Sequence, residues 1–516
     1  MVWQPEVEEL ARRRALAHAM GGAERVGRQH AQGKLTVRER IDGLVDAGTF
    51  HEIGELAGDG VYEDGELVGF TPRARVLGLA ELDGRPVVVG GSDFTIRGGS
   101  GKGMGQNPGL SEDLASAYRL PRVELYDAAG ANVEAIADQG AIYLPNSFNN
   151  WPRRFKQMQQ APCVSAVLGS VAGGPAGWAV AAHFSVMVKG TSAIFASGPP
   201  VVRRALGHEI DKEQLGGSQV HTRVSGLVDN EAASEEDAFV QIRRFLSYMP
   251  SNVWEAPPEV EPRPAPEGTE DLLSIVPRNR KRPYSMKRLI RLLVDGGEFF
   301  EIAPRYGASV ITALTRVEGK AFGVVANNPN VYGGAMDATA SRKLGRFLEL
   351  CDYFHLPVLY LVDIPGFLIG EQAERAGTLR SGAGAIWSWA TMTVPSFTIH
   401  IRKCYGMAGA TTSNASRLSW RLAWPSGEFG SIPIEGGVDA AFRRQIAEAD
   451  DPDAKRQELE DSMAKYRNPF LTAEAAGVEE IIDPRETRTH IARWLKLAYR
   501  VLPQELGPKP KYGVRP

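Results

Sequence analysis

The sequence has few cysteines, almost no net charge and no long apolar run. Its 516 residues include only Cys163, Cys351 and Cys404, too few and too scattered for a disulfide framework or a zinc ribbon. A formal net charge of −3 leaves no basic stripe for phosphate contacts, so we expect no nucleic-acid partner. No window approaches the roughly 20 apolar residues of a membrane span, and the charged N-terminus lacks the apolar centre of a signal peptide. We therefore expect a cytoplasmic protein without a membrane segment.

One pattern occurs twice along the chain. The segment IDGLVDAGTFHEI at 41–53 matches IRLLVDGGEFFEI at 290–302, an offset of 249. Further matches follow in the same order, with Gly98 corresponding to Gly333 at an offset of 235. An ordered series of matches with a slowly drifting offset indicates an internal duplication, because chance recurrence of glycine would not keep the order.

The composition also indicates where the two copies are joined. The segment at 254–270, WEAPPEVEPRPAPEGTE, is dense in proline and glutamate and is typical of an extended linker. We predict an N-terminal domain over 1–253 and a C-terminal domain over 271–516, since a chain of this length exceeds one core. Short apolar strands alternate with amphipathic helices in both, which predicts an α/β fold with parallel strands.

Each half contains a strand, a glycine and then a helix. The first is VSAVLGSVAGGPAGWAVAA and the second is SFTIHIRKCYGMAGATTSNA. The first N–H groups of a helix have no partner within it, and glycine lets both the chain turn tightly and a ligand approach the backbone. Such N–H groups suit an oxygen that gains negative charge in a transition state. One such turn is more often a plain connection, but two at matching places in a repeat favour a function.

Several longer segments carry a resemblance to a known family. They are MGGAERVGRQHAQGKLTVRERIDGLVDAGTFHEI, SDFTIRGGS, KEQLGGSQVHTRVSGLVD, NVYGGAMD, LPVLYLVDIPGFLIG and IRKCYG, of which KEQLGGSQVHTRVSG (212–226) is the most specific. Over nearly its whole length the chain resembles the carboxyltransferase (beta) subunits of biotin-dependent acyl-CoA carboxylases of the propionyl-CoA carboxylase type. The resemblance implies two tandem crotonase-like domains related by duplication. It also implies a homohexamer, a dimer of trimers, with each active site between two subunits.

The resemblance further implies the chemistry. A carboxyl group moves from carboxybiotin, held by the C-terminal domain, to the α carbon of an acyl-CoA, held by the N-terminal domain. Backbone N–H groups hold the biotin oxyanion and the thioester enolate in turn, and no metal takes part. The residues implied are, for catalysis, Gly173, Gly174, Met407 and Ala408; for acyl-CoA binding, Gly130, Ala131, Gly409 and Ala410; and for biotin binding, Pro365, Gly366, Phe367 and Tyr405.

The chain departs from the family pattern near these residues. Met407 stands where a second glycine is usual, and Pro175, which has no N–H, stands where alanine is usual. Proline is tolerated in the first turn of a helix, so the nest of N–H groups can still form. Gly409 and Ala410 replace a tyrosine and an aspartate of the propionyl-type pattern. This loss of side-chain volume motivates the hypothesis of an acyl group longer or more branched than propionyl.

Two absences indicate that the chain is one part of a larger enzyme. The A-M-K-M tetrapeptide of a biotin carboxyl carrier does not occur, the nearest segment being YSMKRL at 284–289. No glycine-rich ATP-binding region stands out either. We therefore expect a partner alpha subunit that carries the biotin and the biotin carboxylase activity.

Three other functions remain open from the sequence. The first is a decarboxylase that runs the same transfer onto biotin in a membrane-linked sodium pump. The second is a crotonase-type hydratase or isomerase, which needs a carboxylate base, with Glu134 and Glu371 as the nearest candidates. The third is a scaffold subunit that has lost catalysis, which Met407 and Pro175 keep open.

Overall fold

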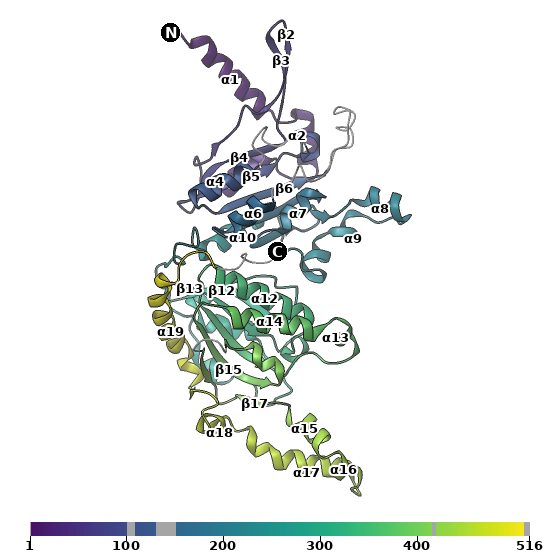
Figure 1. Cartoon of the computed structure of the whole chain (residues 1–516), viewed down its shortest axis with the longest axis vertical. Coiled ribbons are helices and arrows are strands. Elements are labelled where there is room, and N and C mark those ends of the chain that lie inside the picture. The colour runs from purple at the N-terminus through teal and green to yellow at the C-terminus, as the bar shows by residue number, and fades with distance from the viewer. Residues whose placement is uncertain (1, 101–108, 131–150, 415–418, 510–516) are drawn as a thin grey trace. The chain divides into compact units, whose positions relative to one another are not determined.

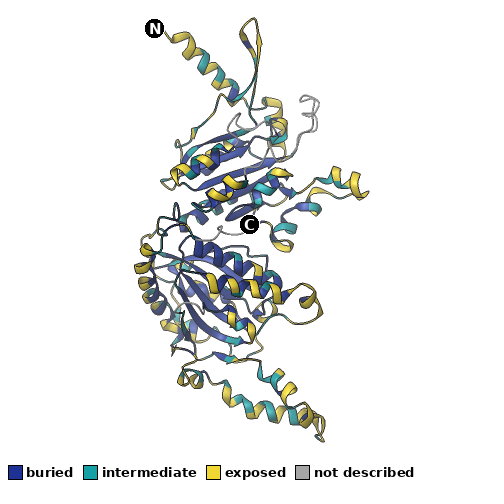
Figure 2. Ribbon diagram, viewed as in Figure 1, coloured by how far each residue is buried: buried dark blue, intermediate teal, exposed yellow. Residues whose placement is uncertain are grey.

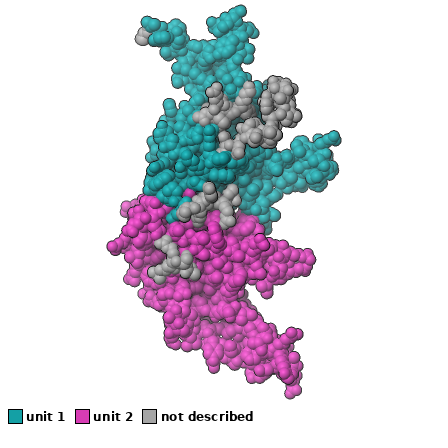
Figure 3. All heavy atoms as spheres, viewed as in Figure 1, with its two compact units in different colours: residues 1–255, 507–516 teal, residues 256–506 magenta. Residues whose placement is uncertain are grey.

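The computed structural model describes residues 2–100, 109–130, 151–414 and 419–509 (Figure 1). The chain forms two compact units, Met1–Glu255 together with Gly507–Pro516, and Ala256–Leu506 (Figure 3). Each unit is an α/β domain built on one eight-stranded sheet. Across the described ranges, no helix combines the length and the apolar character needed to cross a membrane.

The sheet of unit 1 has the order β1-β4-β5-β6-β7-β8-β10, and β9 pairs with β7 beyond the end of β8. The pairs β1–β4 and β4–β5 are antiparallel, and the pairs from β5 to β10 are parallel. The strands are β1 (His51–Glu52), β4 (Arg75–Leu82), β5 (Arg85–Ser92), β6 (Arg122–Ala128), β7 (Cys163–Ala172), β8 (Phe184–Val188), β9 (Ala193–Phe195) and β10 (Asn230–Ala232). A separate hairpin of β2 (Gly58–Glu63) and β3 (Glu66–Pro72) lies beside helix α1 (Gln4–His18).

The sheet of unit 2 repeats this order as β11-β12-β13-β14-β15-β16-β18, with β17 paired to β15. Its strands are β11 (Phe299–Glu301), β12 (Val310–Val317), β13 (Lys320–Asn327), β14 (Val358–Ile364), β15 (Ser396–Tyr405), β16 (Ser419–Ala423), β17 (Glu428–Gly430) and β18 (Glu480–Ile481). The register of the central parallel pair even shifts at the same place, between Tyr126 and Ala128 in one unit and between Val362 and Ile364 in the other. The predicted duplication of a crotonase-like domain is confirmed.

Helices cover both faces of each sheet, so the central strands are buried (Figure 2). In unit 2, α11 and α19 pack on one face, where the Phe397 and Trp494 rings stack at 5.3 Å. Tyr360 points to the opposite face and stacks on Trp389 of α14 at 5.9 Å. The helices that matter below are α3 (Val37–Leu44), α4 (Leu110–Tyr118), α6 (Trp151–Met158), α7 (Gly174–Val180), α10 (Glu235–Tyr248), α11 (Met286–Leu293), α12 (Ala338–Tyr353), α14 (Thr378–Thr391), α15 (Ile434–Ala441) and α19 (Thr487–Val501).

The aspartate of the repeated opening motif fastens a hairpin in unit 1. The Asp46 carboxylate accepts hydrogen bonds from the N–H groups of Asp83 (3.2 Å) and Gly84 (2.8 Å), in the turn between β4 and β5. Arg243 of α10 donates to the same carboxylate (2.9 Å) and to the carbonyl of Leu44 (2.8 Å), at the end of α3. One carboxylate thereby ties the hairpin, α3 and the last helix of the unit together.

Unit 2 has the same arrangement, built from the second copy of the motif. We call each arrangement, an aspartate bonded to two N–H groups of a hairpin turn and to one arginine, an aspartate clamp. Asp295 accepts from the N–H groups of Glu318 (3.1 Å) and Gly319 (2.9 Å), in the turn between β12 and β13. Arg488 of α19 donates to Asp295 (2.6 Å) and to the carbonyl of Leu293 (2.8 Å). The motif occurs twice because each domain needs its own clamp, a structural role that is separate from catalysis.

The segment between the domains is extended but belongs to unit 2. The N–H of Val260 donates to the carbonyl of Gly319 (3.1 Å), and the N–H of Gly296 donates to the carbonyl of Pro264 (2.9 Å). At the other end of the chain, the N–H of Gly507 donates to the carbonyl of Val253 (2.7 Å), so the last described residues group with unit 1. The sequence does not predict that the C-terminal residues return to unit 1, because no periodic pattern indicates this contact.

We expect Asp295→Ala to destabilise the protein more than Asp46→Ala. The side chain of Asp295 is 4% exposed, whereas that of Asp46 is 27% exposed. Removing one partner of a buried ion pair costs about 3 kcal/mol, and removing one from a water-accessible pair costs about 1 kcal/mol or less. Urea denaturation followed by tryptophan fluorescence measures both changes, and equal losses would contradict the burial argument.

Candidate active site

The first turn joins β7 to α7 through Gly173. Its φ of 65° and ψ of −129° are accessible to glycine and strained for other residues. Its N–H donates to the carbonyl of Phe195 on β9 (3.3 Å), and its carbonyl accepts from the N–H of Gly177 (3.2 Å). The N–H of Gly173 is therefore occupied, which corrects the prediction that it is an open donor. Of the predicted pair, Gly174 keeps an N–H without an acceptor among the described residues.

The second turn joins β15 to the short 3-10 helix η7 (Met407–Thr411) through Gly406. Gly406 has φ 64° and ψ −160°, and its N–H donates to the carbonyl of Gly430 on β17 (3.0 Å). The next two N–H groups, of Met407 and Ala408, have no acceptor in the described part of the chain. Met407 is 54% exposed, whereas Ala408 is buried, so the Met407 side chain lies at the surface of this turn.

The two turns are equivalent in the duplicated fold, because each glycine donates to a short auxiliary strand. Gly173 corresponds to Gly406 at an offset of 233, so Gly174 and Pro175 correspond to Met407 and Ala408. Proline has no N–H, so the first turn lacks one donor that the second turn has. The next N–H along α7 is that of Ala176.

The predicted acyl-CoA residues lie on two different turns. Gly130 has φ 91° and follows β6, and a Cβ on it would lie 2.8 Å from the carbonyl oxygen of Ala172 at the end of β7. Gly130 and Gly173 thus lie at the carboxyl ends of neighbouring parallel strands, where α/β folds bind ligands. Gly409 is half-buried and Ala410 is exposed, both on η7 of unit 2. Ala131 lies outside the described residues.

Three of the four predicted biotin residues follow β14. Pro365, Gly366 and Phe367 are half-buried, and the Phe367 ring packs against Gly382 of α14. Gly366 has φ 140°, and none of the described residues places an atom within 4 Å of where its Cβ would stand, so this backbone is accessible. Tyr405, the fourth, is only 3% exposed and donates its hydroxyl hydrogen to Glu428 (3.0 Å). The structure therefore places Tyr405 beneath the second turn, and its role toward biotin remains a prediction.

A buried aspartate holds the end of β6 and another holds the end of β14. Asp127 accepts from Lys34 (3.0 Å) and Arg40 (3.2 Å), and a Cβ on Gly169 would lie 2.0 Å from its carboxylate oxygen. In unit 2 the position of Gly169 is taken by Arg402, at an offset of 233, and Arg402 donates directly to Asp363 (3.0 Å). The two domains neutralise the equivalent carboxylate with cations from different segments.

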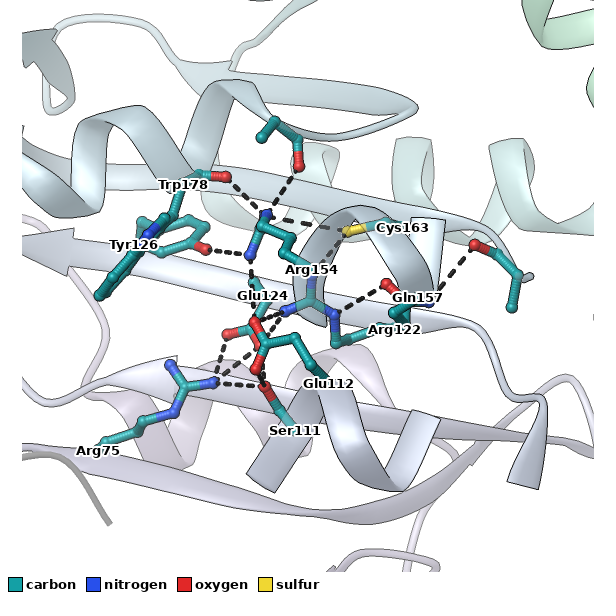
Figure 4. Close-up of polar contacts among 12 residues, drawn as sticks. Arg75, Ser111, Glu112, Arg122, Glu124, Tyr126, Arg154, Gln157, Cys163 and Trp178 are labelled. Carbon is teal, nitrogen blue, oxygen red and sulfur yellow. Dashed lines mark hydrogen bonds and ion pairs between the residues drawn. The ribbon is translucent and has the colours of Figure 1, made fainter. Parts of the chain in front are cut away.

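A buried charge network lies at the start of β6 and β7 and at the end of α7 (Figure 4). Arg154 is 2% exposed and donates to the carbonyls of Trp178 (2.6 Å) and Ala181 (3.0 Å), at the end of α7. Arg122, fully buried, pairs with Glu112 (2.8 Å) and with Glu124 (3.0 Å). Arg122 and Arg154 thus have structural partners and cannot reach CoA phosphates at the surface.

The same network explains the ionisation of Glu124. Burial alone would raise the pKa of Glu124, but the charges of Arg75 and Arg122 outweigh it and lower that pKa to about 2. Arg75 bonds Glu124 at 2.7 Å. The carboxylate is therefore ionised at neutral pH and keeps the guanidinium groups of Arg75 and Arg122 in place.

The most specific sequence motif, at 212–226, supports the first turn from the outside. It forms helix α9 (Lys212–Gly216) and the π-helical segment η3 (Val220–Val224). A Cβ on Gly216 would lie 2.2 Å from the carbonyl oxygen of Ile194, and His221 Nε2 contacts that same oxygen at 2.7 Å. The motif therefore holds β9, whose Phe195 accepts the N–H of Gly173. The sequence resemblance identified this motif as the most specific one, but it did not predict the contact of the motif with β9.

The candidate base and the candidate metal ligands are both engaged elsewhere. Glu371 is 74% exposed and pairs with Arg375 one helical turn away, so it faces solvent; Glu134 lies outside the described residues. In the described ranges, one group of side chains, His18, Glu52 and Glu55, comes close enough together to hold a metal ion. Its carboxylates are already paired, Glu52 with Arg38 and Glu55 with Arg14.

Comparison with known proteins identifies the family. The carboxyl transferase domain matches residues 28–508. The chain is 35% identical to a propionyl-CoA carboxylase carboxyltransferase subunit of Haloferax mediterranei, covering 96% of both chains. It is 34% identical to the methylmalonyl-CoA decarboxylase subunit alpha of Veillonella parvula, again covering 96% of both.

A solved structure agrees with the fold as well as with the sequence. Transcarboxylase 12S, a hexamer crystallised with methylmalonyl-coenzyme A and methylmalonic acid, superposes with a TM-score of 0.86 at 32% identity. The superposition covers 96% of this chain and 95% of that one. The resemblance carried by the sequence motifs is confirmed, and the protein is an enzyme: the chain belongs to the carboxyl transferase family.

Proposed function

We propose that the chain moves a carboxyl group from carboxybiotin, carried by a partner subunit, to the α carbon of an acyl-CoA. The observation that carries the proposal is the pair of turns, one per duplicated domain, each with open backbone N–H groups. Similarity to a propionyl-CoA carboxylase subunit and to transcarboxylase 12S supports an acyl-CoA substrate. Two turns suit a reaction in which negative charge develops on two different oxygens.

In unit 1, the N–H of Gly174 would donate to the thioester oxygen as the α carbon loses its proton and the enolate forms. A preorganised donor aimed at developing charge contributes about 2.7–4 kcal/mol to transition-state stabilisation. The backbone at Gly130, at the adjacent strand end, would contact the acyl-CoA from the other side. Arg154 holds the far end of α7, so the donor stays in place during the reaction.

In unit 2, the N–H groups of Met407 and Ala408 would hold the ureido oxygen of biotin. Biotin, when bound, supplies the carboxyl group and accepts the proton of the α carbon. The open backbone at Gly366 and the exposed Met407 side chain fit a flat ring that approaches the turn from solvent. No charged side chain is needed, because uncharged backbone N–H groups stabilise each oxyanion.

We infer a partner and an assembly from the same arrangement. The biotin would come from a biotin carboxylase and biotin carboxyl carrier alpha subunit. We propose a homohexamer, a dimer of trimers, in which a first turn and a neighbour's second turn share one site. Two observations support it: transcarboxylase 12S assembles as a hexamer, and unit 2 exposes Ile369 (86%), Leu379 (53%) and Trp387 (51%), which are apolar side chains typical of an interface.

Decarboxylation is the second candidate function. The 34% identity to a methylmalonyl-CoA decarboxylase subunit favours it as much as carboxylation. The same N–H groups serve the reverse transfer, from an acyl-CoA carboxyl group to biotin. A hydratase is less well supported, because Glu371 faces solvent.

The acyl preference is tested with a purified complex of this chain and its biotinylated partner. We expect labelled bicarbonate and ATP to carboxylate an acyl-CoA longer or more branched than propionyl-CoA, because small Gly409 and Ala410 leave volume at the second turn. Preference for acetyl-CoA and propionyl-CoA over all longer chains would show the acyl hypothesis to be wrong. Labelling of no acyl-CoA at all would overturn the proposed reaction.

Replacing Gly174 by proline tests the first turn. Gly174→Pro removes the open N–H, and we expect kcat to fall about 10²- to 10³-fold, the measured range for losing one oxyanion donor. Pro175→Ala is the matched control, because it alters the adjacent residue while adding an N–H, and we expect it to keep full activity. An active Gly174→Pro enzyme, or equal losses in both variants, would mean that this N–H does not act in catalysis.

A further inference from the structure

The second turn is set by a very short strand. β17 runs parallel to β15, with Lys403 opposite Glu428 and Tyr405 opposite Gly430. The Gly430 carbonyl accepts the N–H of Gly406 at 3.0 Å, so the position of β17 fixes the peptide of Gly406. The direction of the next two N–H groups follows from that peptide. A strand of three residues has little pairing of its own to keep it in place.

One nearly buried carboxylate fastens this strand. Glu428 is 9% exposed and accepts two hydrogen bonds from Arg280, at 2.6 Å from Nε and 2.5 Å from Nη2. Two parallel hydrogen bonds between guanidinium and carboxylate fix both distance and orientation. Tyr405, the residue before Gly406, donates its hydroxyl hydrogen to the same carboxylate at 3.0 Å. We name Arg280, Glu428 and Tyr405 the latch.

The electrostatics keep the proton on Tyr405 and the charge on Arg280. Burial, together with the negative charge of Glu428, raises the pKa of Tyr405, so its hydroxyl remains a donor at neutral pH. Burial would lower the pKa of Arg280, but its bonds to Glu428 outweigh burial and raise that pKa. Arg280 also reaches Glu435 of α15 at 2.9 Å, a second carboxylate outside the sheet.

Unit 1 has no counterpart of the latch at the equivalent positions. The equivalent pairing of β7 with β9 places Ala172 where Tyr405 stands and Ala193 where Glu428 stands. Both alanines pair with the same register, and Gly173 still donates to β9. Unit 1 instead holds β9 through His221 and the close approach of Gly216, both at the carbonyl of Ile194, so the charged latch is the support that unit 2 uses for the equivalent strand.

We propose that Arg280 and Glu428 are positioning residues of the second turn. Through Tyr405 and β17 they aim the N–H groups of Met407 and Ala408 at a single oxygen. The inference rests on the proposed function of the second turn. It adds two residues that touch neither substrate but set the geometry of the donors.

Two readouts test the latch in the assembled enzyme with Arg280→Gln and Glu428→Gln. Hydrogen exchange of the peptides covering 403–412 reports the turn itself and needs no catalysis. Steady-state kinetics with free biotin as carboxyl acceptor and methylmalonyl-CoA as donor report the reaction. We expect faster exchange at the turn and a fall in kcat of about tenfold or more, the scale for a misplaced donor, with KM for the acyl-CoA within about twofold of wild type.

Two control variants break comparable ion pairs. Glu435→Gln leaves the Arg280–Glu428 pair intact and removes the carboxylate that Arg280 shares with Arg467, and Arg421→Gln breaks the exposed pair of Arg421, on β16, with Glu479 (2.8 Å). We expect wild-type exchange and kcat in both. Arg280→Lys keeps the charge and one bond to Glu428, and we expect an intermediate kcat.

The outcomes separate the inference from the function on which it rests. Unchanged exchange at 403–412 in both latch variants, or an equal fall in kcat in the controls, would overturn the latch. A wild-type complex without carboxyl transfer would overturn the proposed function, while the exchange data would still decide whether the latch holds the turn. If Arg280→Gln fails to fold, Tyr405→Phe removes one latch bond and is expected to give the same change in exchange.

Discussion

The pairing of a long strand with a three-residue auxiliary strand is the constraint on which both turns depend. β7 pairs with β9 and β15 pairs with β17, in the same register. In each case a glycine just past the long strand donates its N–H to the short strand, and the N–H groups that follow it find no acceptor among the described residues. Removing either short strand would leave the glycine free to rotate, and the donors would lose a common direction.

This constraint explains why the structure surrounds the auxiliary strands with polar contacts. In unit 1, His221 and the close approach of Gly216 both reach the Ile194 carbonyl on β9. In unit 2, a salt bridge from Arg280 reaches Glu428 on β17. Different chemistry at equivalent places indicates that each turn was stabilised separately after duplication. Asp46 and Asp295, by contrast, have equivalent partners in the two copies, namely two N–H groups of the hairpin turn and one arginine, because the hairpin has the same role in each domain.

The sequence predicted what is local or repeated, and missed what depends on distant pairing. The duplication, the α/β class and the glycine at each turn follow from motifs that keep their order. The open donor of the first turn could not be placed on Gly174 alone, because only the pairing with Phe195, 22 residues away, occupies Gly173. The hydrogen bond of Tyr405 to Glu428, 23 residues along the chain, could not be predicted either, because no periodicity connects the two residues.

The two turns differ in a way that suits two different ligands. The second has two successive open N–H groups, at Met407 and Ala408, and a charged latch beneath them. The first has Gly174 followed by Pro175, so it offers one donor fewer at the matching position. An oxygen held by two latched donors stabilises a full negative charge better than one held by a single donor. The difference between the turns therefore indicates that the second turn stabilises the greater negative charge. In the first turn, Pro175 restricts the backbone next to the one remaining donor, the N–H of Gly174.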